Sequence, residues 1–371
     1  MFLVFVSNVL NHHSRFLCEE LIKKCDNFCF VSTDYFGDVG YQKPLNEKYV
    51  VNYNASNKQI VQKLIIEADA VIYGSCPNEL ISIRMELNKL SFLYTERFFK
   101  KGTWRRFIPQ TKKKIYNRLL KYKNKRLYVL AASSYVKDEL KKLRFPVEKC
   151  FKFGYFPETR YYEIADKVID EKEKKSILWA ARFIDWKHPE LPILIAKQLV
   201  KDGYNFTLRM IGDGPKKSKI MKFAIKSGVQ KNIRFLGSLS PNEVRDFMEK
   251  SEFFLFTSDQ KEGWGAVLNE SMNSCCVAIA NIKAGSTQFL IDGKTNGLIY
   301  NDETPKKIAN IIADLWKNER KRKQISLGAY NTIADDWNSK RAAERLVDVI
   351  LLLKNDRNPI NLYRDGILSE A

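Results

Sequence analysis

The chain has 371 residues, 45% of them apolar and 12% aromatic, which is enough to bury the cores of two domains of about 150–200 residues each. This composition excludes a disordered or low-complexity protein. Lysine and arginine number 63 against 43 for aspartate and glutamate, a net charge of +20. We therefore expect a polyanionic partner, which could be a phosphorylated substrate, an anionic membrane surface or a nucleic acid.

The seven cysteines include no CxxC pair, and the chain has only three histidines, His12, His13 and His188. We expect reduced cytosolic thiols, with neither a disulfide framework nor a structural metal. Residues 1–6 are apolar but lack the basic region and the cleavage site of a signal peptide, so they predict a buried strand. The other apolar runs are much shorter than the ~20 residues that a membrane span needs.

Short apolar runs alternate with amphipathic stretches through the first half of the chain. Strands are predicted at 2–6, 28–32, 70–73, 90–94 and 127–131, and helices at 15–24 and 58–67. Such alternation is typical of a parallel sheet with helices on both faces. The polar segment 163–175 then predicts an inter-domain linker, with a solvated helix as the alternative.

The second half repeats this rhythm. Strands are predicted at 176–180, 206–211, 233–236, 253–256 and 277–280, and helices at 189–201, 216–227, 241–250 and 265–274. We therefore predict an α/β protein with two Rossmann-like, doubly wound domains facing a cleft, at 1–165 and 176–338, followed by a segment at 339–371. Ligands of open α/β sheets bind at the carboxyl ends of the strands, so functional residues are expected in the loops that follow strands.

Three motifs in the second half follow or lie between predicted strands. Arg182 and Lys187 lie five residues apart after the strand at 176–180. The turn Gly212-Asp213-Gly214-Pro215 follows the next strand, and Glu262-Gly263-Trp264-Gly265 precedes Glu270. The guanidinium fork of arginine and the point charge of lysine both suit phosphate oxygens. Taken alone, such a pair of cations is also compatible with a solvated loop.

The two carboxylates of the third motif are spaced for different contacts. On a single helix, Glu262 and Glu270 would be separated by ~12 Å, which exceeds the ~5–9.5 Å between paired glycosidase carboxylates. The spacing favours contacts at two ends of an elongated ligand. Gly263 and Gly265 would allow the backbone to approach such a ligand. The alternative is a helix-dipole contact for Glu262 and a surface carboxylate at Glu270.

Together, these motifs resemble the donor-binding half of the retaining glycosyltransferases of family 4, which have the GT-B fold; the resemblance spans residues 176–337. It implies a C-terminal domain that binds a nucleotide-sugar, an N-terminal domain that binds the acceptor, and a last helix in 339–371 that returns to the N-terminal domain. Arg182, Lys187 and Glu262 would then be catalytic. Gly212, Gly263, Trp264, Gly265 and Glu270 would bind the donor.

The resemblance also implies a retaining, metal-independent transferase without a cofactor. No Asp-x-Asp triplet occurs in the sequence, whereas enzymes that hold the diphosphate through a divalent metal usually have one. The implied acceptor is a glycan or lipid-linked molecule in cell-surface polysaccharide synthesis. The alternatives are another GT-B enzyme, such as a nucleotide-sugar epimerase, and a non-enzymatic basic scaffold that binds membrane or nucleic acid.

Candidate acceptor-binding residues lie in the first half. His12 and His13 follow the first predicted strand, and on an extended chain only one of them would face the site. Glu96 follows the strand at 90–94, where many members of the resembling family have a histidine. A structural or solvent-facing role for the histidines and a salt bridge for Glu96 are the alternatives.

The segment 97–126 contains 13 lysines and arginines and no acid, interleaved with aromatic residues. Ile115, Tyr116, Leu119 and Leu120 have helical spacing. A basic amphipathic helix of this kind favours an anionic membrane surface. We therefore expect a cytoplasmic protein that binds the inner face of the cell membrane peripherally. A core-packed helix with a solvated basic face is the main alternative, and nucleic-acid binding is less favoured.

Overall fold

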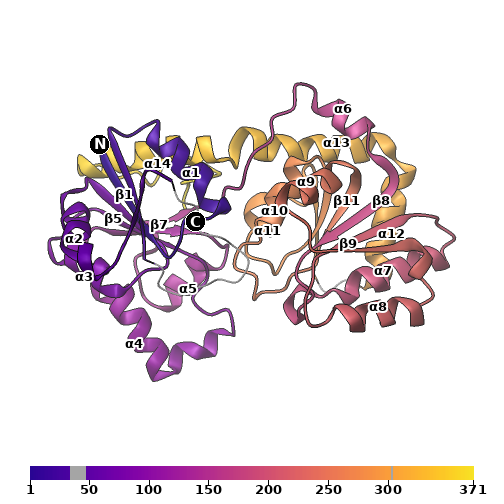
Figure 1. Cartoon of the computed structure of the whole chain (residues 1–371), viewed down its shortest axis with the longest axis horizontal. Helices are drawn as coiled ribbons and strands as arrows, with labels where there is room; N and C mark the ends of the chain where they lie inside the picture. Colours follow the sequence, from indigo (N-terminus) through magenta and orange to yellow (C-terminus); the bar gives the residue numbers. More distant parts are fainter. Residues whose placement is uncertain (34–46, 302–303) are drawn as a thin grey trace. The chain divides into compact units, whose positions relative to one another are not determined.

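The computed structural model describes residues 1–33, 47–301 and 304–371 (Figure 1). The chain forms two compact units. The first unit comprises Met1–Glu158 and Trp337–Ala371, and the second comprises Thr159–Asp336. Each unit contains one parallel sheet with helices packed against it, which is the arrangement that alternating strands and helices favour.

The sheet of the first unit has the strand order β3-β2-β1-β4-β5-β6-β7, and its paired strands are parallel. The strands are β1 Phe2–Ser7, β2 Asn27–Ser32, β3 Val50–Asn52, β4 Ala70–Tyr73, β5 Ser91–Thr95, β6 Leu127–Ala131 and β7 Cys150–Lys152. The helices are α1 His12–Ile22, α2 Lys58–Glu67, α3 Asn78–Glu86, α4 Pro109–Arg118, α5 Val136–Lys142 and α14 Ser339–Lys354. The central strands are continuously apolar because helices cover both faces of the sheet.

The sheet of the second unit has the order β10-β9-β8-β11-β12-β13, which is the doubly wound order of Rossmann folds. Its strands are β8 Glu173–Ala180, β9 Thr207–Ile211, β10 Ile233–Gly237, β11 Ser251–Phe256, β12 Val277–Asn281 and β13 Leu298–Tyr300. Its helices are α6 Ala165–Asp170, α7 Glu190–Lys201, α8 Lys217–Lys226, α9 Pro241–Glu249, α10 Val267–Asn273, α11 Thr287–Leu290, α12 Pro305–Lys317 and α13 Glu319–Asn331.

The predicted α/β class and the pair of Rossmann-like sheets are confirmed. All ten strands predicted between residues 2 and 280 are present in the structure, most of them within two residues of the expected ends. The predictions omitted β3, β7 and β13, which have three residues each, and the helices α3, α5 and α11. These elements are too short to establish a clear hydrophobic period.

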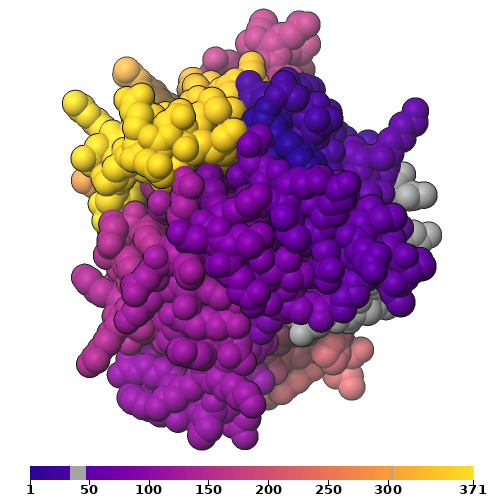
Figure 2. Space-filling model, turned by 90° about the vertical axis from the view of Figure 1, so that its left-hand side faces the viewer, coloured from indigo at the N-terminus to yellow at the C-terminus, as the bar shows by residue number. Residues whose placement is uncertain are grey.

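The C-terminal segment returns to the first unit, as predicted. Helix α14 packs on α1, and Figure 2 shows the C-terminal residues in yellow directly beside the N-terminal residues in indigo. The last residues then bond to strand β7. The amide of Lys152 donates to the carbonyl of Ser369 at 2.9 Å, and the carbonyl of Lys152 accepts from the amide of Leu368 at 2.8 Å. The chain end therefore covers an otherwise open sheet edge.

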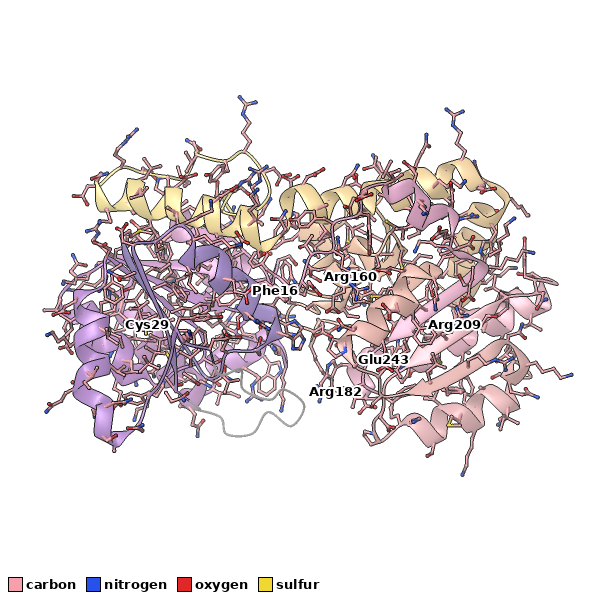
Figure 3. All side chains as sticks on the ribbon, turned by 45° about the horizontal axis from the view of Figure 1, so that its top comes forward. Phe16, Cys29, Arg160, Arg182, Arg209 and Glu243 are labelled. Carbon is pink, nitrogen blue, oxygen red and sulfur yellow. The ribbon has the colours of Figure 1, made fainter. Side chains whose placement is uncertain are left out.

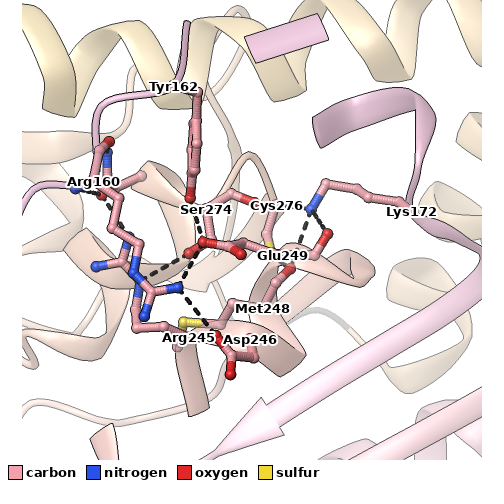
Figure 4. Close-up of polar contacts among 10 residues, drawn as sticks. Arg160, Tyr162, Lys172, Arg245, Asp246, Met248, Glu249, Ser274 and Cys276 are labelled. Carbon is pink, nitrogen blue, oxygen red and sulfur yellow. Dashed lines mark hydrogen bonds and ion pairs between the residues drawn. The ribbon is translucent and has the colours of Figure 1, made fainter. Parts of the chain in front are cut away.

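The segment 163–175, predicted as a linker, is folded onto the second unit and contains α6 and the start of β8. Figure 4 shows the polar contacts that hold it. Arg160 and Tyr162 bind Glu249 of α9 at 2.8 and 2.6 Å, and the buried ammonium of Lys172 donates to three main-chain carbonyls at 2.8–3.1 Å. Since these contacts fix residues from 160 onward, the units divide after Glu158 and not at the predicted 165–176.

Within the described ranges, the structure contains no helix that combines the length and the apolar character needed to cross a lipid bilayer.

Candidate functional site

The carboxyl end of the second sheet is formed by loops that bond to one another. The amide of Ala181, after β8, donates to the carbonyl of Ile211 at the end of β9 at 3.1 Å. The amide of Phe183 donates to the carbonyl of Asp213 at 2.8 Å. The amide of Gly212 donates to the carbonyl of Gly237 at 2.7 Å. The predicted arginine–lysine loop and the Gly-Asp-Gly-Pro turn are therefore direct neighbours.

Gly212 is required by this packing. Its φ of +125° is a backbone conformation that other residues rarely adopt, and an added Cβ would lie 2.0 Å from the carbonyl oxygen of Ala181. The carboxylate of Asp213 accepts from the amide of Gly214 in the same turn at 2.7 Å and pairs with Lys217 of α8 at 2.8 Å. Gly212 thus sets how closely the two loops approach, which is a structural role in addition to the predicted contact with a donor.

Lys187 and Glu262, both predicted site residues, are 75 residues apart in the sequence. In the structure they form an ion pair. Only 12% and 15% of their side chains are exposed. The carbonyl of Lys187 accepts a hydrogen bond from Thr257, which in turn accepts one from the buried indole of Trp179 at 2.8 Å. This chain of bonds anchors the backbone of Lys187 to the core of the unit, and the pair with Glu262 holds its ammonium.

Arg182 lies in the same loop and is exposed. Figure 3 shows it at the periphery of the second unit, whereas Arg209 lies along β9. The guanidinium of Arg182 lies 5.9 Å from the ring centroid of Trp186, a distance typical of a cation–π contact. Arg182 and Lys187 therefore both belong to the carboxyl end of β8, one exposed and one paired with a carboxylate.

The Glu-Gly-Trp-Gly turn corrects two expectations. The indole of Trp264 is fully buried and donates to Asn269 at 2.8 Å, so this side chain is a core group and does not face a donor. Helix α10 begins only at Val267, so Glu262 and the half-buried Glu270 do not share one helix and the spacing estimated for a single helix does not apply. Gly265, with φ +84°, is needed because an added Cβ would lie 2.5 Å from the ring of Phe256.

A charged cluster that was not predicted from the sequence lies beside Lys187. The Nδ1 atom of His188 lies 3.1 Å from Glu190, and its Nε2 atom lies 3.3 Å from Asp259 in the loop after β11. The bond to Glu190 raises the pKa of His188, burial opposes this, and the bond to Asp259 adds to it. The position of Asp259 and Thr257 just after a predicted strand was the available signal.

His12 and His13 begin helix α1, and the side chain of Asn11 caps this helix by accepting from the amide of His13 at 3.0 Å. The expectation that only one histidine can face a given side assumed an extended chain and is wrong, because in the helix the two ring centroids lie 3.7 Å apart. Burial, and then the charge of His12, lower the pKa of His13 to about 3. His13 is therefore a neutral group at physiological pH.

Glu96 lies at the same edge of the first sheet and is linked to His13 through Tyr155. The ring of Tyr155 stacks on His13 at a centroid distance of 5.9 Å, and its hydroxyl donates to Glu96 at 2.7 Å. Glu96 also pairs with Lys100. The structure thus brings the three predicted acceptor residues together. It adds Tyr155, which the sequence analysis missed because β7, the strand before it, was not predicted.

The basic segment 97–126 is only partly a surface. Arg97 forms a buried ion pair with Glu139 at 2.9 Å, Arg118 donates to the carbonyl of Cys76 at 2.9 Å, and Arg126 donates to the carbonyl of Leu353. The expectation that the whole segment faces a membrane is wrong for these three residues, because their guanidinium groups bind within the first unit. Helix α4 ends at Arg118, before Leu119 and Leu120.

The two sheets and their loops define a GT-B architecture, and solved structures share it. A structure of Anabaena HepE in complex with UDP superposes with a TM-score of 0.69 and 15% identity, covering 95% of this chain and 100% of that one. A structure of WaaG, a glycosyltransferase involved in lipopolysaccharide biosynthesis, gives a TM-score of 0.63 and 14% identity, covering 94% and 99%. At these identities, the likeness concerns the fold.

Residues 162–332, which make up most of the second unit, match the family described as Glycosyl transferases group 1. An uncharacterized glycosyltransferase of Methanocaldococcus jannaschii is 34% identical over 137 residues, which are 37% of this chain and 38% of that protein. The capsular polysaccharide biosynthesis glycosyltransferase CapH of Staphylococcus aureus is 29% identical over 120 residues, 31% of this chain and 33% of that protein. The chain thus matches less than half the length of these relatives.

Proposed function

We propose that the protein transfers a sugar from a nucleotide-sugar donor to a glycan or lipid-linked acceptor in the synthesis of a cell-surface polysaccharide. The proposal includes retention of the anomeric configuration and independence from metal ions. The observation on which it depends is the placement of Arg182, Lys187 and Glu262 at the carboxyl end of one sheet. This is the end at which open α/β sheets bind nucleotides.

The charges of the second unit suit a diphosphate. Lys187 already faces the carboxylate of Glu262. A diphosphate that bound here would exchange one anionic partner of Lys187 for another and would also attract the exposed Arg182. As the sugar–phosphate bond breaks, negative charge accumulates on the leaving phosphate, and the two cations stabilise it more strongly than they stabilise the ground state. In this scheme, Arg182 and Lys187 supply the positive charge for which other transferases use a metal ion.

Glu262 has a second part in this scheme. Once Lys187 turns to the diphosphate, the carboxylate of Glu262 is free to accept hydrogen bonds from sugar hydroxyls. Retention then proceeds by attack of the acceptor on the face from which the diphosphate leaves, and the departing phosphate assists removal of the acceptor proton. This route needs no protein nucleophile. Glu270, Gly263 and Gly265 complete the proposed donor site, with Glu270 on the ribose.

The acceptor is proposed to bind at the carboxyl edge of the first sheet, where His12, His13 and Glu96 gather around Tyr155. A neutral histidine and a carboxylate are groups that bind sugar hydroxyls through hydrogen bonds. Burial keeps the pKa of His13 low, so this residue would bind its acceptor in the same neutral form over the whole physiological pH range.

Donor binding is tested by thermal unfolding of the protein with UDP-, GDP- and ADP-sugars in the presence of EDTA. UDP is the first candidate because it is bound in the Anabaena HepE structure that shares the fold. At a ligand concentration of about 100 times Kd, we expect a stabilisation of roughly 2.7 kcal/mol and a raised Tm. The absence of a shift with every nucleotide-sugar would contradict the donor site. A shift that requires a divalent metal would contradict metal independence alone.

The proposed membrane partner rests on the part of segment 97–126 that is exposed. Trp104, Phe107 and Tyr116 are 61%, 64% and 56% exposed. Arg105 lies over the ring of Trp104 and Arg106 over that of Phe107, and Lys112, Lys113 and Lys114 are exposed on α4. We call these eight residues the basic–aromatic patch. Aromatic rings flanked by cations suit the headgroup layer of an anionic bilayer.

The double substitution of Trp104 and Phe107 by alanine should weaken binding to vesicles that contain phosphatidylserine by at least about tenfold, because each exposed ring would lose its apolar contact with the bilayer. Cosedimentation with phosphatidylserine–phosphatidylcholine vesicles measures this. The matched control is Ile60→Ala, which removes a side chain of 61% exposure outside the patch. Equal loss with both variants, or equal binding to pure phosphatidylcholine, would contradict the proposal. Preferential binding of DNA would favour a nucleic-acid scaffold instead.

A further inference from the structure

His188 differs from the other two histidines in both conformation and surroundings. Its φ of +47° lies in the left-handed region, which costs a residue with a Cβ some free energy unless the surroundings hold it there. Two carboxylates contact its ring nitrogens and stabilise this conformation. Glu190, at the start of α7, lies 3.1 Å from one nitrogen, and Asp259, after β11, lies 3.3 Å from the other. The ring is thus fixed between two separate elements.

The two carboxylates determine the charge of the ring. A neutral imidazole has one N–H donor and one acceptor nitrogen, so one of its nitrogens would face a carboxylate oxygen without a proton between them. Only the imidazolium donates to both Glu190 and Asp259. Burial is the largest single effect on the pKa of Glu190 and raises it, but the bond to His188, a main-chain hydrogen bond and the charges of His188 and Lys216 together lower this pKa. Both partners therefore favour the ionised pair.

The other charges around this ring are largely neutralised among themselves. Asp185, on the same loop, pairs with Lys216 after β9 at 2.5 Å. The charge of Lys216 also lowers the pKa of Glu190. The charge of Lys261, after β11, lowers the pKa of Asp185. The neighbouring Lys187 pairs with Glu262. His188 is thus the cation that faces both Glu190 and Asp259 directly.

The same contacts connect the two loops of the proposed donor site. Asp259 binds His188 through its side chain, and its amide donates to the carbonyl of Trp186 at 2.9 Å. Its own carbonyl accepts from the amide of Glu262 at 3.0 Å. Loss of the His188–Asp259 contact would therefore loosen the backbone on which both Lys187 and Glu262 stand.

We propose that protonated His188 is a positioning residue for Lys187 and that the affinity of this sheet edge for a diphosphate diester falls as His188 loses its proton. This inference depends on the proposed function for its ligand but not for the charge of His188. The sign follows from the raised folded-state pKa. The stabilisation is fully present below the unfolded-state value of about 6.5, and it is lost as the pH rises through the higher value of the folded protein.

Proton NMR of the imidazole groups tests the charge directly, because the chain has only three histidines. We expect one titrating resonance above pH 6.5 that disappears in His188→Asn, and no other resonance above it, since the pKa values of His12 and His13 are both lowered. Asparagine tolerates the left-handed backbone, so this variant should fold. A resonance assigned to His188 that titrates at or below 6.5 would overturn the inference.

UDP-glucose binding tests the positioning role. This ligand is preferred over UDP, because the terminal phosphate of UDP titrates near pH 6 like other phosphate monoesters. Between pH 6 and pH 9, we expect the affinity of the parent protein to fall by about twofold to fivefold, a range typical of one ion pair, and the affinity of His188→Asn and His188→Gly to remain constant. The glycine variant removes the ring and also relieves the backbone.

The outcomes separate this inference from the proposed function. Binding that is independent of pH in the parent protein, or equally dependent on pH in all three proteins, would overturn the positioning role and leave the donor site intact. The absence of UDP-glucose binding at every pH, with a normal NMR titration, would overturn the choice of ligand and with it the proposed donor, while the imidazolium between Glu190 and Asp259 would be confirmed.

Discussion

Replacing Lys187 by alanine is expected to lower the rate of sugar transfer by a factor of about 10²–10³, the usual effect of removing one fixed group that stabilises transition-state charge. The same change should weaken binding of the nucleoside diphosphate, because an ammonium would be lost from the site. Initial rates with the donor identified by thermal unfolding, and calorimetric titration with the diphosphate, measure the two effects. Lys323→Ala is the matched control, since Lys323 pairs with Asp170 and Glu319 elsewhere in the same unit.

Glu262→Gln should have the opposite effect on binding and a similar effect on transfer. The amide removes the anionic partner of Lys187 but keeps the size of the side chain, so the ammonium becomes more available to the diphosphate and affinity should be unchanged or higher. Transfer should still fall by about 10²-fold or more, because the carboxylate no longer binds the sugar. If the glutamine variant transfers sugar at the parent rate, Glu262 has no role on the sugar; if it loses diphosphate affinity, the proposed exchange of partners by Lys187 is wrong.

The second large effect is expected at the start of the basic segment. Glu139→Ala should destabilise the first unit by about 3–5 kcal/mol, the usual cost of leaving one partner of a buried ion pair without the other. Glu139 is 1% exposed and accepts from the guanidinium of Arg97 and from the amides of Phe98 and Phe99 at 2.5 and 3.3 Å. Its removal would take one acceptor away from the guanidinium of Arg97 and from two main-chain amides.

Hydrogen exchange within the first unit is the suitable measurement, because two units need not unfold in one transition. Lys137→Ala on the same helix is the control, since its pair with Glu370 is exposed and should contribute about 0–1 kcal/mol. Glu139→Gln should lie between the two, because an amide oxygen can still accept from one main-chain amide. Equal exchange rates in Glu139→Ala and Lys137→Ala would show that the buried pair contributes no more than a surface pair.

The sequence predicted the positions of strands and of the loops after them better than it predicted side-chain surroundings. Strands buried on both faces are continuously apolar, and the residues that follow them are therefore identifiable; Arg182, Lys187 and Glu262 were found in this way. Their mutual contacts depend on which strands are neighbours in the sheet, and this order comes from the Rossmann-like topology and not from the local pattern.

Where prediction failed, tertiary contacts outweighed the local pattern. Trp264 belongs to a motif that faces a donor by analogy, but its indole finds Asn269 within the core. The polar composition of 163–175 indicated a linker, whereas Lys172 is buried because three carbonyls accept its protons. The two histidines were assigned to an extended chain because the capping side chain of Asn11, which begins the helix there, was not recognised.

The return of the C-terminal segment to the first unit has a consequence for how the protein is made. Residues 159–336 are contiguous, so the second unit can fold as soon as it leaves the ribosome, whereas the first unit must wait for residues 337–371 to emerge. Until then, α1 lacks α14, and β7 lacks its bonds to the last residues. The part of the chain that is synthesised first is therefore completed last, and its apolar surface is exposed to chaperones for the longest time.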